Sequence, residues 1–347
     1  MGWSEIELEL EQLESQELRR KLHVVRSPQD SYVIRGSQRL LSFCSNDYLG
    51  LANHPEIIGA LRQGARLYGV GAGGSHLVCG HMQPHVELEQ ALSECVGQEA
   101  SLLFGSGYLA NLGIMGALAS RHTTFFADRL NHASLNEGAL LLRAKLVRYQ
   151  HMNLSQLSRL MSLEKSRQKI VATDAVFSMD GDRAPLEELS GLCAEHDAWL
   201  IVDDAHGFGL LNAGRGSLYG TTLATDQIVY MATLSKALGG YGAFVAGRQI
   251  LIDYLVQKAK SYIYTTAMPP AMAYAMCHAL QVATMAHEKR EHLSRLIQVF
   301  REGASTLGWE LLPSDTPIQP VMMQTSKRAM ILYNRLLERG ILVPAIR

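Results

Sequence analysis

Short apolar runs alternate with amphipathic stretches along most of the chain. The apolar runs have the length of buried strands, and the amphipathic stretches repeat apolar residues at helical spacing. We expect strands at residues 32–34, 40–43, 101–104, 123–127, 145–149, 170–173, 199–202 and 228–232, and helices at residues 55–68, 84–96, 108–119 and 132–142. Short strands separated by helices predict an α/β fold with a mostly parallel, doubly wound sheet. Its ligand should bind at the carboxyl ends of the strands.

The pattern changes after Lys260. Further helices are predicted at residues 270–285 and after residues 288–291, followed by a turn at 313–320, a strand at 321–324, a helix at 327–339 and a strand at 341–343. We therefore expect an N-terminal part with a helix at residues 1–22 and short strands (1–45), a large domain (46–282) and a smaller α+β C-terminal domain (283–347). Because the chain stops just after a strand, we expect this small domain to be incomplete.

Charge and composition exclude several classes of partner. The formal net charge of −1 and an isoelectric point near 6.9 give no electrostatic reason to expect a nucleic acid or an anionic membrane. The N-terminus has no apolar core of a signal peptide, and no apolar stretch is long enough to span a membrane. The five scattered cysteines lack a C-x-x-C pair, which indicates reduced thiols. We expect a cytoplasmic protein.

The segment Gly69-x-Gly71-x-x-Gly74 matches the dinucleotide-binding fingerprint by letter. That fingerprint lies between a strand and a helix, whereas here a predicted helix precedes it and Ser-His-Leu-Val-Cys follows. We interpret this segment as a flexible glycine loop near an active site.

Polar residues follow three of the predicted strands. Ser106-Gly107-Tyr108 offers free backbone N–H groups to a phosphate, although Gly-Ser-Gly also joins many strands to helices. The segment from Asp203 to His206 resembles a capped helix start or a metal pair, but it lacks an obvious third metal ligand nearby. Lys236 follows the next strand. A surface lysine is possible there, but a Schiff-base lysine is the better interpretation in this context.

Taken in order, five motifs resemble the α-oxoamine synthases, a branch of the fold-type-I enzymes that use pyridoxal phosphate (PLP). The motifs are Ser45–Gly50 (SNDYLG), Asp128–Ser134 (DRLNHAS), Val176–Asp182 (VFSMDGD), Asp203–Gly207 (DDAHG) and Ser235-Lys236. The resemblance covers nearly the whole chain. Thr265–Ala271 and Val343–Arg347 most resemble the branch of the family that condenses L-alanine with a pimeloyl thioester to give 8-amino-7-oxononanoate.

The resemblance implies roles for single residues. Lys236 would hold PLP as a Schiff base and transfer protons, Asp203 would pair with the pyridine nitrogen, and His132 would stack on the ring. The remaining cofactor contacts would be Ser178 and His206 to the phenolic oxygen, Ser106, Gly107, Tyr108 and Thr233 to the phosphate or ring, and Thr266 from the partner subunit of a homodimer. The substrate contacts would be Asn46, Arg19 and Arg347. For Arg19, a solvated position at a helix C-terminus is an equal alternative.

The implied reaction joins L-alanine to a pimeloyl group carried on CoA or acyl carrier protein, with loss of CO2, in biotin biosynthesis. No metal is implied. Two departures from the family pattern stand out: Asp174 replaces a glutamate that is usual near the Val176–Asp182 motif, and a C-terminal strand bearing a carboxylate-binding arginine is missing. If the usual glutamate helps to orient the acyl group, the side chain of Asp174 is one methylene shorter and its carboxylate reaches less far.

Three other functions stay open at this point. The first is another α-oxoamine synthase, which would use glycine with acetyl-CoA or succinyl-CoA, or serine with a long acyl chain. The second is a PLP-binding protein without turnover, because the C-terminal strand is missing. The third, far behind, is a metal hydrolase that uses Asp203, Asp204 and His206.

Overall fold

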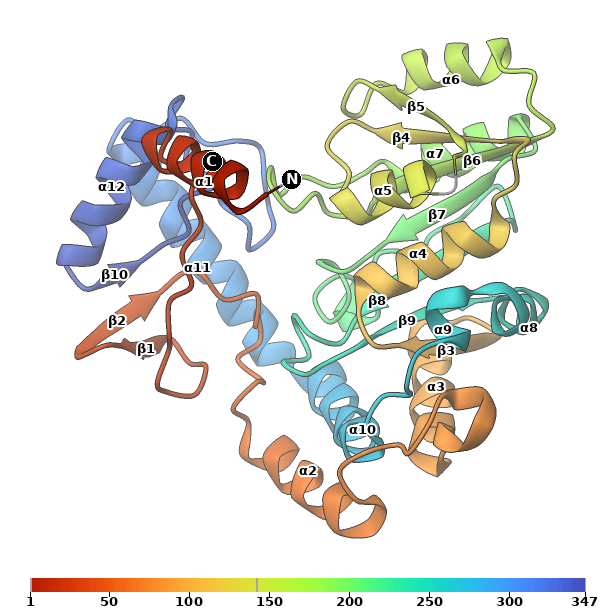
Figure 1. Cartoon of the computed structure of the whole chain (residues 1–347), viewed down its shortest axis with the longest axis horizontal. Coiled ribbons are helices and arrows are strands. Elements are labelled where there is room, and N and C mark those ends of the chain that lie inside the picture. Colours follow the sequence, from red (N-terminus) through yellow and green to blue (C-terminus); the bar gives the residue numbers. More distant parts are fainter. Residues whose placement is uncertain (1, 142, 347) are drawn as a thin grey trace. The chain divides into compact units, whose positions relative to one another are not determined.

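A seven-stranded sheet forms the centre of the larger part of the molecule (Figure 1). The computed structural model describes residues 2–141 and 143–346. In the order in which they pair, the strands are β3 (Ala100–Phe104), β9 (Ala243–Gly247), β8 (Ile228–Thr233), β7 (Trp199–Asp203), β6 (Gln168–Asp174), β4 (Thr123–Asp128) and β5 (Lys145–Tyr149). Strand β9 runs antiparallel to both neighbours, and the other pairs are parallel.

The two faces of the sheet bury alternate residues of the same strands. Leu103 and Phe126 pack into one core, and Leu102 and Phe125 into the other. The first core also contains side chains of α2 (Pro55–Tyr68), α3 (Gln83–Val96), α6 (Leu154–Leu163), α7 (Leu186–Glu195) and α10 (Pro270–Met285). The second contains side chains of α4 (Gly107–Leu118), α5 (Ala133–Leu141), α8 (Gln249–Lys258) and α9 (Lys260–Ile263). The prediction of a doubly wound, mostly parallel sheet is confirmed.

Strand β9 was not predicted. Its sequence, Ala-Phe-Val-Ala-Gly, follows Gly239, Gly240 and Gly242, and such a glycine cluster is typical of a loop. All five residues of β9 are nevertheless buried, because the strand lies between β3 and β8. Tertiary pairing overrides the local preference there.

Two other predictions about elements were wrong. The first helix, α1, spans only Trp3–Ser15 and not residues 1–22. Residues 321–324 form no strand, because Gln324 has a positive φ of 64° and the chain then turns into α12 (Ser326–Glu338). The N-cap Thr325 accepts a hydrogen bond from the backbone N–H of Arg328 and so starts that helix.

The chain separates into two compact units: Asp47–Pro320, which holds the large sheet, and Met1–Asn46 with Val321–Arg347. The expected boundary after residue 282 falls inside the larger unit, which also includes α11 (His287–Thr306). The smaller unit has a sheet of β1 (Tyr32–Arg35), β2 (Gln38–Ser42) and β10 (Ile341–Leu342).

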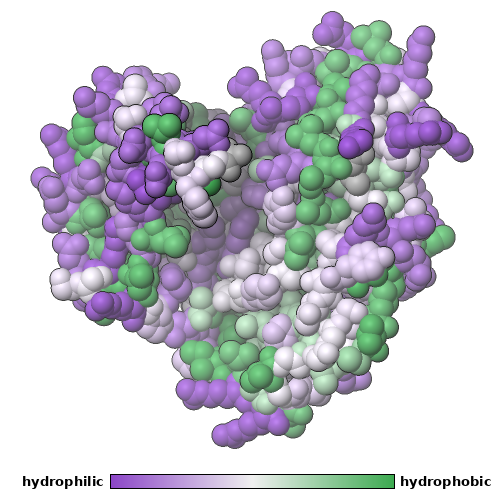
Figure 2. All heavy atoms as spheres, viewed as in Figure 1, coloured by the Kyte–Doolittle hydropathy of each residue, from purple (hydrophilic) through white to green (hydrophobic). Residues whose placement is uncertain are grey.

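Few side chains are buried in the smaller unit. Among its described residues the buried hydrophobic side chains are Val33 and Leu40, and neither α1 nor α12 contains a buried residue. Its visible face is mostly hydrophilic, with scattered hydrophobic side chains (Figure 2). No helix within residues 2–141 and 143–346 is both long and apolar enough to cross a bilayer.

Gly239 should be necessary for stability. It has a φ of +69°, and a Cβ atom at this position would lie 2.2 Å from the backbone nitrogen of Ala52. We expect Gly239→Ala to lower the free energy of unfolding by about 1–3 kcal/mol, measured by urea titration. Gly303→Ala is the control, because nothing lies within 4 Å of its Cβ position inside α11. That variant should be as stable as the parent or about 0.5–1 kcal/mol more stable. Equal stabilities of the two variants would contradict the argument.

Candidate active site

The carboxyl ends of the strands β4, β6, β7 and β8 carry Asp128, Asp174, Asp203 and Thr233 as their last residues. At this edge lies a cavity of about 150 Å³. Its lining consists of Gly107, Tyr108, His132, Ser134, Asp174, Ser178, Asp203, Ala205, His206, Met231, Thr233, Ser235 and Lys236. Eight of the predicted cofactor residues are among them: Gly107, Tyr108, His132, Ser178, Asp203, His206, Thr233 and Lys236. The predicted position of the ligand and the observed cavity therefore coincide.

Other predicted residues lie outside this lining. Ser106 precedes Gly107 and caps α4, where its hydroxyl accepts the N–H of Leu109 at 3.3 Å. Thr266 is exposed. Arg19 and Asn46 belong to the smaller unit, in which Arg19 lies 3.6 Å from Glu14 in a half-exposed ion pair. Arg347 lies outside the described residues.

Lys236 follows β8 in a tight turn, in which Gly239 donates its N–H to the Lys236 carbonyl at 2.9 Å. The amine Nζ lies 2.8 Å from Nε2 of His206. Burial lowers the pKa of Lys236, and the attraction of Asp203 and Asp174 opposes that shift. The amine is therefore partly buried and interacts with buried acids, a setting that suits a proton-transferring lysine.

His206 is held from its other side by a residue that the sequence did not single out. The Tyr48 hydroxyl lies 2.8 Å from Nδ1 of His206. Burial, together with the positive charge of Lys236, lowers the pKa of His206 to about 3, so the ring is neutral at physiological pH. Tyr48 belongs to the SNDYLG motif, but its partner is 158 residues away in the chain. Only the fold reveals this contact.

Asp203 is oriented by two hydrogen-bond donors. One carboxylate oxygen accepts the N–H of Ala205 at 3.0 Å, and the other accepts Nδ2 of Asn111 at 2.8 Å. The same amide group of Asn111 donates to the Ser134 hydroxyl at 2.9 Å, and that hydroxyl lies 2.8 Å from Nδ1 of His132. A continuous polar network thus joins Asp203 to His132. Asn111 was missed because nothing in the sequence distinguishes it from other polar residues on a helix.

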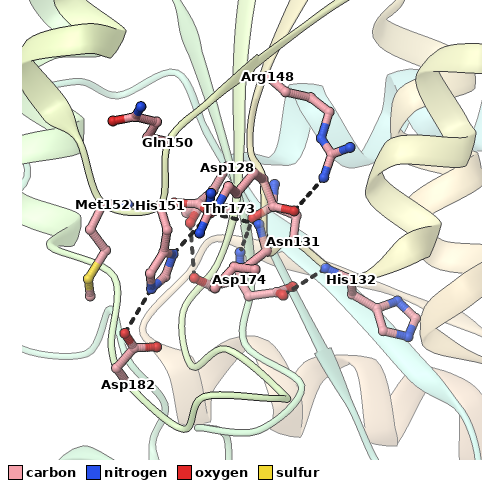
Figure 3. Close-up of polar contacts among 12 residues, drawn as sticks. Asp128, Asn131, His132, Arg148, Gln150, His151, Met152, Thr173, Asp174 and Asp182 are labelled. Carbon is pink, nitrogen blue, oxygen red and sulfur yellow. Dashed lines mark hydrogen bonds and ion pairs between the residues drawn. The ribbon is translucent and has the colours of Figure 1, made fainter. Parts of the chain in front are cut away.

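Asp174 supports the backbone beside His132. One carboxylate oxygen accepts the His132 N–H at 2.8 Å (Figure 3). Burial and the neighbouring Asp203 raise the pKa of Asp174 well above its ordinary value. In this structure the shorter side chain of Asp174 is therefore used to position His132.

Asp204 has a different environment from Asp203 although the two are consecutive. One of its carboxylate oxygens accepts the Ser217 N–H and the Tyr230 hydroxyl, both at 2.7 Å, and Asp204 does not line the cavity. A metal site built from Asp203, Asp204 and His206 would need Asp204 to point the other way. Within the described residues, no group of three or more His, Cys, Asp or Glu side chains is arranged to hold a metal ion.

Comparison with known proteins identifies the family to which this chain belongs. Residues 38–347 match the model of the aminotransferase class I and II family. The 8-amino-7-oxononanoate synthase of Nitrosospira multiformis is 50% identical over 324 residues, which are 93% of this chain and 82% of the relative. The enzyme of the same name from Methylobacillus flagellatus is 52% identical over 331 residues, 95% of this chain and 84% of the relative.

Solved structures agree with this assignment. An 8-amino-7-oxononanoate synthase from Francisella tularensis superimposes with a TM-score of 0.78 at 31% identity, over 88% of each chain. A serine palmitoyltransferase from S. paucimobilis with a bound PLP–myriocin aldimine gives a TM-score of 0.90 at 27% identity, over 99% of this chain and 90% of that one.

Asp204 should make stability depend on pH. Burial raises its pKa from 3.8 to about 7, so between these values the folded state binds a proton that the unfolded state has lost. Stability from this group therefore falls as the pH rises through that window. We expect Asp204→Asn to flatten this dependence in urea titrations at several pH values, because the amide oxygen still accepts from Ser217 and Tyr230. The exposed Asp226→Asn should shift stability by no more than about 0.5 kcal/mol. An unchanged slope in Asp204→Asn would refute the assignment.

Proposed function

Because this chain belongs to the aminotransferase class I and II family and, within it, to the 8-amino-7-oxononanoate synthases, we propose that its cavity condenses L-alanine with a pimeloyl thioester. The enzyme uses pyridoxal phosphate and transfers an acyl group in biotin biosynthesis. The thioester is carried on CoA or acyl carrier protein. The observation that carries the proposal is the convergence of the Lys236 amine and the Asp203 carboxylate in one cavity.

The residues present fit pyridoxal phosphate. The Lys236 amine can bind the aldehyde of the cofactor, and the fixed Asp203 carboxylate can face the nitrogen of the cofactor ring. The His132 ring can stack on the face of that cofactor ring. The N-terminus of α4, with the Ser106 cap and Gly107, offers backbone N–H groups and a favourable dipole to its phosphate. Tyr108 and Thr233, which also line the cavity, complete the proposed contacts to the phosphate or ring.

When bound, the cofactor draws electrons away from the amino-acid α-carbon. The chain supplies the remaining functions. Asp203, held by Asn111 and Ala205, would keep the ring nitrogen protonated through its negative charge. The Lys236 amine, whose pKa is lowered by burial, removes the α-proton of L-alanine and later returns one to the product.

Further contacts complete the proposed site. Ser178 and the neutral His206, which line the cavity, would bind the phenolic oxygen of the cofactor, and Tyr48 holds the His206 ring in place. Asn46 would bind the alanine carboxylate and Arg19 the acyl chain. Arg347 is proposed as a further substrate contact.

We also propose a homodimer with shared active sites. The segment that contains Thr266 is joined to the glycine loop by the Ala267 N–H, which donates to the Gly74 carbonyl at 3.0 Å. Val78, four residues after the glycine loop, and Tyr264, two residues before Thr266, are each 81% exposed. Large exposed apolar side chains on adjoining segments favour a subunit interface, through which Thr266 would reach the partner's cofactor. Five free thiols support a cytoplasmic location.

Lys236→Ala should abolish the visible absorbance of lysine-bound PLP and reduce CO2 release from L-alanine and pimeloyl thioester by at least about 10³-fold. The matched control is Lys258→Ala, an exposed lysine at the end of α8, which should behave like the parent. An undiminished absorbance band in Lys236→Ala would refute the role of this lysine. Faster turnover of glycine with acetyl-CoA or succinyl-CoA, or of serine with a long-chain thioester, would instead assign the chain to another α-oxoamine synthase.

Light scattering should report a dimer, and Val78→Glu should shift it toward the monomer because it places a charge in an apolar interface. PLP should then bind at least about tenfold more weakly, since the Thr266 contact from the partner is lost. Leu163→Glu, at the end of α6, is the control for an exposed apolar residue outside these segments. A monomer that binds PLP as tightly as the dimer would contradict the proposed role of Thr266.

A further inference from the structure

His151, which follows β5, lies between two aspartates at the edge of the site (Figure 3). Its Nδ1 is 3.0 Å from Asp128 at the end of β4, and its Nε2 is 2.8 Å from Asp182 in the loop after β6. The Phe177 ring meets the imidazole edge-on at a centroid distance of 4.5 Å. Both ring nitrogens therefore face carboxylate oxygens, and His151 does not line the cavity.

Each aspartate belongs to a loop that supplies a residue to the cavity. Asp128 accepts the backbone N–H groups of Leu130 and Met152, both at 2.8 Å, and so shapes the loop that leads to His132. The second loop is closed by the Phe177 N–H, which donates to the carbonyl of Asp182 at 3.0 Å, and it contains Ser178. His151 is thus a bridge between the two loops.

The bridge requires a charged ring. A neutral imidazole has one N–H donor and one acceptor, so it would leave a nitrogen lone pair against one of the carboxylates. An imidazolium donates to both and offsets their negative charge. Of the neighbouring titratable groups, the Arg148 guanidinium donates to the Arg129 carbonyl rather than to Asp128 or Asp182, and burial raises the pKa of Tyr149, which keeps that side chain uncharged.

We propose that His151 is a positioning residue whose protonated ring holds the His132 and Ser178 loops together, so that its deprotonation as the pH rises loosens the cofactor site. This inference rests on the proposed function, because His132 and Ser178 are taken to contact pyridoxal phosphate. It assigns to the site an alkaline limit that is separate from the titration of Lys236.

The electrostatics of the site give the direction of the pH effect. Burial by itself would lower the pKa of His151, but the hydrogen bonds to Asp182 and Asp128 outweigh it and raise the pKa above the ordinary 6.5. The bridge is therefore fully formed below the ordinary pKa and is lost as the pH rises through the raised one.

The test compares His151→Asn, Asp182→Asn and a control, His287→Asn. His287 forms an exposed ion pair with Glu291 at 3.2 Å on α11 and should not affect the site. The PLP dissociation constant is measured by absorbance between about pH 6 and 9. In parallel, the 13 histidines are titrated by NMR in isotope-labelled protein without PLP, with the His151→Asn spectrum assigning the His151 signal.

In the parent protein, His151 should titrate above 6.5 and PLP affinity should fall through the same pH range. His151→Asn should bind PLP about 10–100-fold more weakly at the acidic end, because displaced contacts are costly, and should lose the alkaline dependence. Asp182→Asn should rescue binding at alkaline pH, since an amide can donate to the neutral ring. This variant should also lower the pKa of His151.

A His151 pKa at or below 6.5, or parent-like PLP affinity and pH dependence in His151→Asn, would overturn the proposal. If His151→Asn does not fold, the imidazole signal that shifts in the Asp182→Asn spectrum assigns His151, and the parent titration together with Asp182→Asn decides the question. Failure of the proposed function is seen separately, as a parent protein that binds no PLP at any pH. The His151 titration is independent of that result, because it is recorded without PLP.

Discussion

Repulsion among acidic side chains at one edge of the sheet is the constraint around which this site is built. Parallel pairing of β4, β6 and β7 brings Asp128, Asp174 and Asp203 to the same edge, and the register places Asp174 directly beside Asp203. All three are buried. Buried carboxylates are costly unless each is paired, hydrogen-bonded or protonated.

The fold accommodates each carboxylate in a different way, and the differences create the chemistry. Asp203 receives two N–H donors and remains available to a cationic ligand. Asp174, with its raised pKa, favours the protonated form and supports the His132 backbone. Asp128 accepts two backbone N–H groups and faces His151. One row of acids is thereby divided into a hydrogen-bonded carboxylate in the cavity, a support for the His132 backbone and an anchor for the neighbouring loop.

The two histidines near this edge have opposite protonation states for the same electrostatic reasons. Burial and the facing Lys236 amine lower the pKa of His206, whereas the two carboxylates that face His151 raise its pKa above the ordinary value. A neutral ring has one donor nitrogen and one acceptor nitrogen. The tautomer of His206 therefore sets both contacts at once: if the nitrogen facing Tyr48 donates, the nitrogen facing Lys236 must accept, and the reverse.

The sequence by itself determined the doubly wound sheet and, together with the family resemblance, most residues of the cavity. Alternation of apolar and polar residues is a local property, and polar residues after strands converge in any parallel sheet. Local signals failed at β9, where flanking glycines concealed a buried strand, and at residues 321–324, where a positive φ at Gln324 precedes the turn into α12. Only the tertiary structure decided the partners of the site residues. Asn111 meets Asp203 across 92 residues and Tyr48 meets His206 across 158, and such pairs depend on how the β-α units pack. Packing also made Asp203 and Asp204 different: Asp203 lines the cavity, whereas Asp204 is held by the Ser217 N–H and the Tyr230 hydroxyl.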